Sequence, residues 1–335
     1  MSPFEYTSSQ FVDTFSKGKQ QALALYRCLL REGSLRETLS SFANAPALYE
    51  NMTSSLDLTT LHLDATYEED STIRFLTRTH DNHAVESVII PMEHGDTLCV
   101  SSQIGCNMGC SFCRTARLGL TRNLSAAEIV QQLFIARFSL HRTISNVVFM
   151  GMGEPLDNYD AVVQASNILS DQNGFAIGAK HITVSTCGLI KPILALAKDP
   201  HFHSNLTVSI NAPTDKLRAR LMPSRRHETL SLLHNAIVTY MKTKKKKVYL
   251  SYILLDNIND SLEMADELIT YIQGLDTRIN LIPYNSFPGS AFKSPSEEKI
   301  NTFLSYLRKR NVPVLLRGTK GDSINAACGQ LAAES

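Results

Sequence analysis

The chain has 335 residues, and its 33 Lys and Arg against 32 Asp and Glu give a formal net charge of +1. The overall charge therefore does not indicate a nucleic-acid-binding protein, and any contact with nucleic acid must come from local basic patches. No apolar run is long enough to span a membrane, and residues 1–19 are polar and unlike a signal peptide. We expect a cytoplasmic protein with no membrane partner, large enough for a main core and an accessory domain.

The first third of the chain predicts two different kinds of structure. Residues 20–31 carry an apolar stripe at helical spacing, and residues 35–61 are typical of short, polar helices. We therefore predict a small α-helical accessory domain over residues 1–62. Residues 63–96 alternate like antiparallel strands around a turn at 79–82, which predicts a β-hairpin-like connection.

From residue 97 to residue 317, strand-like runs alternate with helical stretches. One helix start is clear, because Ser125 and Glu128 form the pattern of a capping box. The predicted strands are 97–101, 146–150, 181–185, 206–210, 248–255, 279–283 and 312–316. Strands that alternate with helices are typical of a parallel α/β sheet, so we predict about six β/α units in a barrel or part of one. Residues 318–335 remain as a C-terminal loop and tail.

Three of the seven cysteines lie within eight residues, at Cys106, Cys110 and Cys113. Thiolates are soft ligands that suit iron–sulfur clusters or zinc. Structural zinc needs four protein ligands, and no fourth Cys or His follows at a nearby, finger-like spacing. Three ligands would leave one iron of a [4Fe-4S] cluster open to a small molecule. The motif favours such a cluster, and a zinc site or three unrelated thiols is the alternative.

Polar motifs follow the ends of several other predicted strands. They are Gly151–Pro155, Ser185–Gly188, Ser209–Asn211 and Tyr284–Asn285. The carboxyl ends of parallel strands form one rim in α/β barrels. We therefore expect these motifs to meet the cysteine loop at that rim.

Three stretches of sequence stand out, LCVSSQIGC at 98–106, FMGMGEP at 149–155 and AACGQL at 326–331. Together they resemble the RlmN/Cfr family of radical S-adenosylmethionine (SAM) RNA methyltransferases. The resemblance implies a radical SAM partial (β/α)6 barrel with a [4Fe-4S] cluster and SAM. It also implies an RNA substrate, ribosomal RNA and for some members transfer RNA, methylated on an adenine. We predict carbon 2 of an adenine in 23S ribosomal RNA, with Cfr-like methylation at carbon 8 as the alternative. A non-enzymatic zinc- and RNA-binding module is the alternative from another class.

The resemblance also gives each motif residue a role. Cys106, Cys110 and Cys113 correspond to the cluster ligands. The residues that correspond to SAM contacts are Gly153, Glu154, Ser185, Ser209, Ile210, Asn211 and Asn285. Cys328 corresponds to the cysteine that carries the methyl group, Cys99 to the cysteine that resolves the protein–RNA adduct, and Glu86 to the proton acceptor.

The chemistry of adenine explains why these residue types are needed. Carbon 2 or carbon 8 is electron-poor and cannot attack SAM directly. The resemblance implies two SAM molecules per turnover: one methylates Cys328, and the second, cleaved at the cluster, gives the 5′-deoxyadenosyl radical that activates the S-methyl group. Release of the RNA then leaves a disulfide between Cys99 and Cys328. We further expect an external electron donor such as flavodoxin or ferredoxin, and a monomeric enzyme.

Two positions depart from the family pattern. The family usually has His where this chain has Asn211, and usually another residue where it has Cys187. Asn can still donate and accept hydrogen bonds, so SAM binding is not excluded. We assign Cys187 and Cys28 to packing.

Three groups of basic residues are candidates for RNA contact. They are Arg114, Arg117 and Arg122; Arg218, Arg220, Arg225 and Arg226; and Lys242 with Lys244–Lys247. For the lysine run, a solvated helix end is an equally good explanation.

Overall fold

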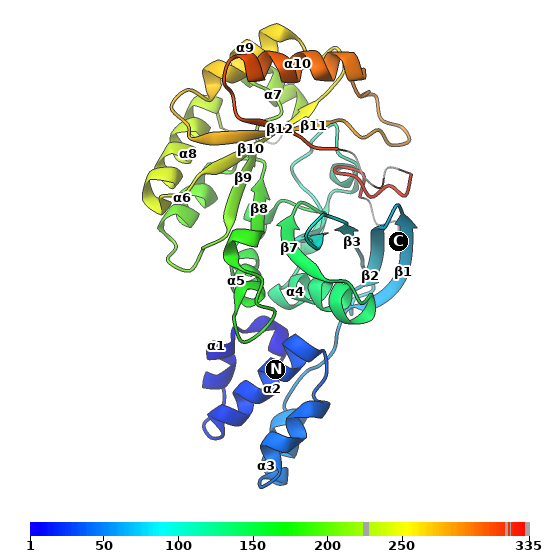
Figure 1. Cartoon of the computed structure of the whole chain (residues 1–335), viewed down its shortest axis with the longest axis vertical. Coiled ribbons are helices and arrows are strands. Elements are labelled where there is room, and N and C mark those ends of the chain that lie inside the picture. Colours follow the sequence, from blue (N-terminus) through cyan, green and yellow to red (C-terminus); the bar gives the residue numbers. More distant parts are fainter. Residues whose placement is uncertain (224–227, 319–320, 322, 332–335) are drawn as a thin grey trace.

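The computed structural model describes residues 1–223, 228–318, 321 and 323–331. Its main element is a sheet of ten strands in the order β1-β2-β3-β4-β7-β8-β9-β10-β11-β12 (Figure 1). The strands are β1 (His62–Glu69), β2 (Thr72–Arg78), β3 (Ala84–Ile90), β4 (Asp96–Cys99), β7 (Ile144–Phe149), β8 (Ile182–Thr186), β9 (Asn205–Ser209), β10 (Val248–Leu254), β11 (Thr277–Pro283) and β12 (Val314–Leu316). A separate two-stranded sheet is formed by β5 (Gln103–Gly105) and β6 (Leu120–Asn123).

Seven strands, β4 and β7 to β12, run parallel to one another in this order. The connecting helices are α4 (Ala126–Phe134), α5 (Tyr159–Ser170), α6 (Ile190–Lys198), α7 (Asp215–Leu221), α8 (Leu230–Lys244), α9 (Leu262–Tyr271) and α10 (Glu297–Lys309). Figure 1 shows these helices on the outer face of the sheet. The predicted α/β class and the seven predicted strands are confirmed, as is the capping box of Ser125 and Glu128 at the start of α4.

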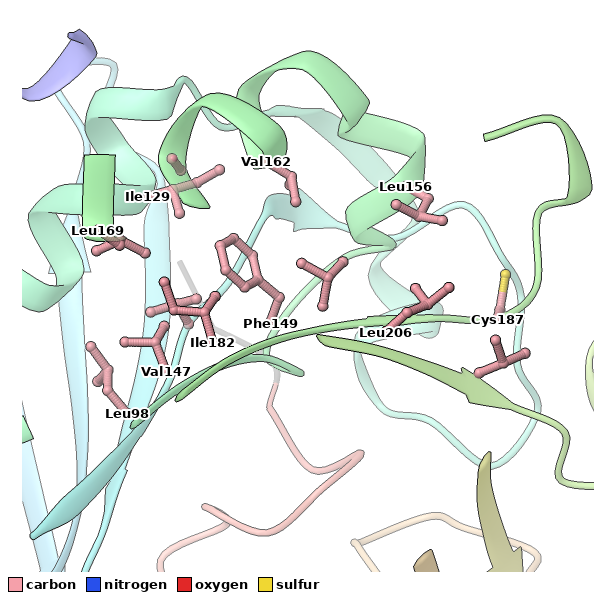
Figure 2. Packing of buried hydrophobic residues seen from close by; sticks show 14 of the residues in the cluster. Leu98, Ile129, Val147, Phe149, Leu156, Val162, Leu169, Ile182, Cys187 and Leu206 are labelled. Carbon is pink, nitrogen blue, oxygen red and sulfur yellow. The ribbon is translucent and has the colours of Figure 1, made fainter. Parts of the chain in front are cut away.

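Alternation along the strands separates an outer face, under the helices, from an inner face. Leu98 of β4 and Phe149 of β7 pack against Ile129 of α4 and Val162 of α5 (Figure 2). Successive residues of a strand point to opposite faces. Cys99, the residue after Leu98, therefore lies on the inner face.

Strands β1, β2 and β3 pair antiparallel and join the barrel strands through β4. The segment predicted as a hairpin-like connection is thus an antiparallel extension of the same sheet. Its inner face is continuous with that of the barrel, because Val88 of β3 lies directly opposite Cys99 of β4. Glu86, two residues before Val88, shares that face.

Helices precede the sheet in the chain, as predicted. They are the 3-10 helix η1 (Pro3–Glu5), α1 (Ser8–Asp13), α2 (Lys19–Glu32), the 3-10 helix η2 (Arg36–Phe42) and α3 (Pro46–Ser54). Phe4 packs edge-on against Phe134 of α4, with ring centroids 5.0 Å apart. Figure 1 shows this helical part beside α4 and α5, away from the other end of the barrel. In the described part of the chain, no helix combines the length and apolar character needed to cross a membrane.

Candidate active site

The three clustered cysteines lie on the loop that follows β5. The Cys106 N–H donates to the carbonyl of Gly119 at 2.7 Å, and the Ser111 N–H donates to the carbonyl of Leu221 at 2.9 Å. Burial raises the pKa of the Cys106 thiol to about 12, and the nearby Cys113 thiol adds to the rise. Burial followed by the charges of Cys113 and Cys106 raises the pKa of Cys110 well above its usual value. The thiols therefore lie together, in surroundings that disfavour thiolates unless a positively charged group binds them.

The three sulfurs do not form a zinc site as they lie. A tetrahedral zinc with Zn–S bonds of 2.3 Å needs sulfurs about 3.8 Å apart. Among the described residues, the one set of three metal-ligand side chains with ligand atoms all within 4.8 Å of one another is His80, Asp81 and Glu128. At least two of the three cysteine sulfurs are therefore more than 4.8 Å apart. A set of three thiolates is also the ligand set that leaves one iron of a [4Fe-4S] cluster open.

The glycines of the Gly151–Pro155 motif bring Glu154 close to the cysteine loop. A Cβ on Gly151 would come within 2.7 Å of Ser101 Oγ and 2.8 Å of the Val100 carbonyl. Gly153 has a φ of +101°, and a Cβ there would lie 2.6 Å from Gln103 Cβ. Only glycine fits such close approaches without displacement.

Glu154 is a buried carboxylate at the carboxyl end of β7. It accepts hydrogen bonds from the N–H groups of Cys187 at 2.7 Å and Leu156 at 3.0 Å. Burial raises its pKa, and the hydrogen bonds oppose the rise. A buried carboxylate of this kind suits a ligand that carries an ammonium group.

Two further residues border this cluster. The buried Cys187 thiol lies beside Glu154 and Cys110, whose charges raise its pKa after the larger effect of burial. Figure 2 shows Cys187 at the edge of the apolar cluster, so its assignment to packing holds, but it also borders the cysteine loop. Arg218 of α7 is 3% exposed and donates to the carbonyls of Cys187 and Ser209. The motif Ser185–Gly188 predicted that Cys187 would lie at this rim, whereas Arg218 carried no sequence signal for this position.

The segment that carries Cys328 packs over Cys99, although the two cysteines are 229 positions apart in the chain, at 328 and 99. Burial raises the pKa of the Cys99 thiol, and the charge of Cys328 is the next largest cause. Cys328 is an exposed residue. The chain around its sulfur nevertheless desolvates the thiolate and raises the pKa of the thiol, and the positive charge of Arg317 opposes this rise. Cys113 also acts on Cys328 electrostatically. Both Cys99 and Cys328 are free thiols in the structure.

The C-terminal segment, residues 321 and 323–331, holds Cys328 over this face. Ala326 and Leu331 pack with Val88, Cys99 and Met152 in a small apolar cluster. The segment is tied to the cysteine loop by hydrogen bonds from the Arg114 N–H to the Gly329 carbonyl at 2.8 Å and from Thr115 Oγ1 to the Leu331 carbonyl at 2.5 Å.

The other predicted SAM contacts lie at strand ends near the same rim. Ser185 and Ser209 are half-buried on the inner faces of β8 and β9, and Ile210 is buried. Asn285, after β11, donates to the Cys328 carbonyl at 3.4 Å.

The side chain of Asn211 forms hydrogen bonds within the protein. It lies at a φ of +57°, its Oδ1 accepts from the Ile253 N–H at 3.1 Å, and its Nδ2 donates to Met222 Sδ at 3.6 Å. Direct contact between this side chain and SAM stays a prediction.

Several of the basic residues expected to contact RNA have contacts within the chain instead. Arg122 pairs with Asp81 and Glu128, both at 2.7 Å. Arg218 is buried, so the expectation of RNA contact is wrong for that residue. Arg225 and Arg226 lie outside the described residues.

The lysine run Lys244–Lys247 begins at the last residue of α8 and ends just before β10, at the end of the barrel away from the site. Lys244 donates to the carbonyls of Asp199 and Phe202, and Lys246 donates to the carbonyl of His203. These contacts favour a structural role for the run. Arg117, in contrast, lies beside the C-terminal face of the barrel, 4.7 Å from the centre of the Phe287 ring.

Comparisons with known proteins agree with this geometry. A family model described as the radical SAM superfamily matches residues 100–269. The probable dual-specificity RNA methyltransferase RlmN 1 of Protochlamydia amoebophila is 44% identical, covering 99% of this chain and 94% of that protein. The dual-specificity RNA methyltransferase RlmN of Geobacter sulfurreducens is 38% identical, covering 94% of this chain and 87% of that protein. The crystal structure of a radical SAM methyltransferase from Sphaerobacter thermophilus matches all of both chains, with a TM-score of 0.91 and 37% identity.

The partial barrel, the cysteine loop and the matching family model define a radical SAM enzyme. Within that superfamily, the chain belongs to the RlmN family of dual-specificity RNA methyltransferases.

Proposed function

We propose that the protein methylates carbon 2 of an adenine in 23S ribosomal RNA and in transfer RNA, through an S-methylcysteine on Cys328. The observation that carries this proposal is the packing of the Cys328 segment over Cys99 and its hydrogen bond to the cysteine loop, on the same inner face as Glu86. A methyl carrier, a second thiol and a base are the groups that such a transfer requires. The dual-specificity RNA methyltransferases among the relatives favour carbon 2 over the alternative, carbon 8.

The residues present fit the cofactors of the superfamily. Cys106, Cys110 and Cys113 would hold a [4Fe-4S] cluster, and the buried Glu154 carboxylate would bind the SAM ammonium group. When bound, the reduced cluster supplies the electron that cleaves SAM and starts radical chemistry. The remaining contacts would come from Gly153, Ser185, Ser209, Ile210, Asn211 and Asn285. The zinc-binding alternative is not supported, because the chain matches the radical SAM superfamily over residues 100–269 and an RNA methyltransferase along nearly its whole length.

The chain's own residues would carry the methyl group in three steps. The Cys328 sulfur takes a methyl group by displacement and loses its proton. The same carbon, after loss of one hydrogen atom, bonds to adenine carbon 2 and joins Cys328 to the RNA. The radical adduct would then give up one electron, for which the oxidised cluster would be the acceptor, and Glu86 would remove the proton from carbon 2.

Cys99 would then release the RNA. Its thiolate attacks the sulfur of Cys328, and the bond between that sulfur and the methylene carbon breaks. The electron pair stays with the carbon, which gains a proton and becomes the new methyl group. The disulfide between Cys99 and Cys328 is reduced by an external thiol. We further propose two SAM molecules per turnover, a flavodoxin or ferredoxin as the electron donor, and a monomeric enzyme.

Anaerobic reconstitution with iron and sulfide, followed by reaction with an RNA transcript, tests this function. Mass spectrometry of the nucleosides should find 2-methyladenosine, whereas 8-methyladenosine alone would overturn the choice of carbon 2. The Cys328→Ala variant should bind four irons but transfer no methyl group, and Cys99→Ala should accumulate a covalent protein–RNA adduct. Cys28→Ala, which removes a buried thiol of helix α2, is the matched control and should turn over normally. Normal turnover by Cys328→Ala would remove that residue from the reaction.

A further inference from the structure

An arginine that no motif marks forms an ion pair with Glu86. Nη1 of Arg74, on β2, donates to Oε1 of Glu86. The Arg74 side chain is 16% exposed and that of Glu86 only 2%. A carboxylate removed from water to this degree stays ionised only if a cation or several hydrogen bonds support it.

The strand register explains how the two side chains meet. Leu76 of β2 lies opposite Glu86, and Arg74 lies opposite Val88, so Arg74 is the diagonal neighbour of Glu86 on the inner face. Long side chains reach across such diagonals. The same face continues to Cys99, opposite Val88 on β4.

Tyr67 fixes the arginine from its other side. Tyr67 of β1 lies directly opposite Arg74, and the guanidinium carbon is 4.2 Å from the centre of its ring. A guanidinium over an aromatic ring is attracted to the ring face and keeps its charge. Arg74 Nε is buried and has no hydrogen-bond acceptor among the described residues, so one donor of the guanidinium group stays without a partner there.

We propose that Arg74, held over the ring of Tyr67, is a positioning residue that keeps the Glu86 carboxylate ionised and oriented for proton removal from the RNA adduct. This inference rests on the proposed role of Glu86 as the base. The positive charge of Arg74 stabilises the ionised carboxylate before the proton transfer, and the ring of Tyr67 limits the rotation of the guanidinium. The proton moves from adenine carbon 2 to Glu86, and Arg74 exchanges no atoms or electrons.

The test separates the steps of the reaction in the reconstituted holoenzyme. The Arg74→Met variant should methylate Cys328 and form the covalent RNA adduct like the wild type, but resolve the adduct at least tenfold more slowly. Peptide mass spectrometry measures Cys328 methylation, and denaturing gels measure the adduct over time. Arg74→Lys keeps the charge and should recover most of the rate. If Arg74→Met does not fold, Arg74→Gln, which keeps a donor without the charge, replaces it with the same expectation.

Arg78→Met is the matched control. Arg78 lies on the same strand and face and pairs with Asp64 at 2.9 Å, so its loss removes a comparable ion pair away from Glu86. It should resolve the adduct at the wild-type rate. Tyr67→Ala should slow resolution by less than Arg74→Met, and Tyr67→Phe should leave it unchanged.

A pH series adds a readout that a purely structural role would not change. By strand register, the titratable groups on the inner face around Glu86 are Arg74 from β2, Cys99 from β4, and Tyr67 and Glu69 from β1, and the segment that carries Cys328 packs against the same face. Without Arg74 the buried carboxylate loses its counter-charge, which favours its neutral form, so more of the basic form should appear as the pH rises. Ionisation of Cys99 affects the wild type and the variant alike. The difference in the rate of adduct resolution between Arg74→Met and the wild type should therefore become smaller between pH 7 and pH 9.

The possible results distinguish this inference from the function on which it rests. If Glu86→Gln stalls at the adduct while Arg74→Met and Arg74→Gln resolve it normally, the positioning role is overturned and the base remains. If Glu86→Gln also resolves the adduct normally, the assignment of the base itself is wrong and the inference falls with it. Loss of Cys328 methylation in the neutral variants would make Arg74 a folding residue and would also overturn the inference.

Discussion

At the scale of single residues, Arg218 is the clearest case of a buried charge with a structural task. It lies on α7 and donates to carbonyls at the ends of β8 and β9, namely those of Cys187 and Ser209. Burial lowers its pKa, and the neighbouring Cys187 and Cys110 thiols oppose this. One side chain thus connects two strand ends that border the cysteine loop.

Replacing Arg218 should therefore cost stability. Arg218→Met removes a charged donor shared by two carbonyls, and we expect the free energy of unfolding to fall by about 2 kcal/mol. Urea unfolding of the protein before reconstitution measures this. Arg220→Met, an exposed arginine of the same helix, should change it by less than about 0.5 kcal/mol. Equal effects of the two substitutions would contradict the structural role of Arg218.

At the scale of elements, the C-terminal segment depends on a tight turn to reach the sheet. Gly321 has a φ of +70°, and a Cβ there would lie 2.8 Å from Ala326 Cβ and 2.9 Å from Thr72 Cγ2. Ser323 then donates from its N–H, at 3.2 Å, and from its hydroxyl to the Glu69 carboxylate of β1. This anchoring holds the segment that carries Cys328 against the face of the sheet on which Cys99 lies.

Gly321→Ala should loosen the segment, because the left-handed conformation costs an alanine about 1–2 kcal/mol and the new Cβ has no room. We expect iodoacetamide to alkylate Cys328 several-fold faster than in the wild type, as measured by peptide mass spectrometry. Gly318→Ala is the control, since a Cβ there meets no atom within 4 Å and its φ is not in the left-handed region. An unchanged alkylation rate in Gly321→Ala would mean that other contacts hold the segment.

The same elements show what the sequence can predict. The parallel strands could be predicted because short apolar runs alternate with apolar residues at helical spacing, and this pattern lies within local stretches of the sequence. The place of β1 to β3 could not, since the pairing of β3 with β4 is a matter of register between strands. Arg74 illustrates the consequence. In the sequence it is one arginine in an alternating strand, and only the register with Val88 brings it to Glu86.

The site divides in the same way. Cys106, Cys110 and Cys113 could be predicted from their spacing, and Glu154 from a motif after a strand. Cys187 could be placed at the rim through its motif after β8. Arg218 could not, because an arginine on a helix has an ordinary structural explanation, and its position beside the cysteine loop comes from the packing of α7 against the ends of β8 and β9.

At the scale of the whole molecule, polar contacts join the N-terminal helices to the barrel. Asp171, just after α5, accepts from the Ser8 N–H at 2.5 Å and the Ser8 hydroxyl at 3.1 Å, at the start of α1. Arg27 of α2 donates to Asn173 Oδ1 at 2.9 Å. The Tyr26 side chain is fully buried, and a Cβ on Gly174 would lie 3.2 Å from its ring. The helical part therefore shares packing and hydrogen bonds with α5 and the turn after it.

This shared boundary predicts one cooperative unfolding transition for the two parts. Asp171→Ala removes the acceptor of two hydrogen bonds at the start of α1, and we expect stability to fall by about 2 kcal/mol. It should also speed tryptic release of the N-terminal helices. Asp13→Ala is the control, because it removes only the exposed ion pair with Lys19, whose side chains are 69% and 60% exposed. Circular dichroism and tyrosine fluorescence should report the same urea midpoint in the wild type. Two separate midpoints in the wild type would show that the N-terminal helices and the barrel unfold independently. The contacts at Asp171 would then contribute little to the stability of the barrel.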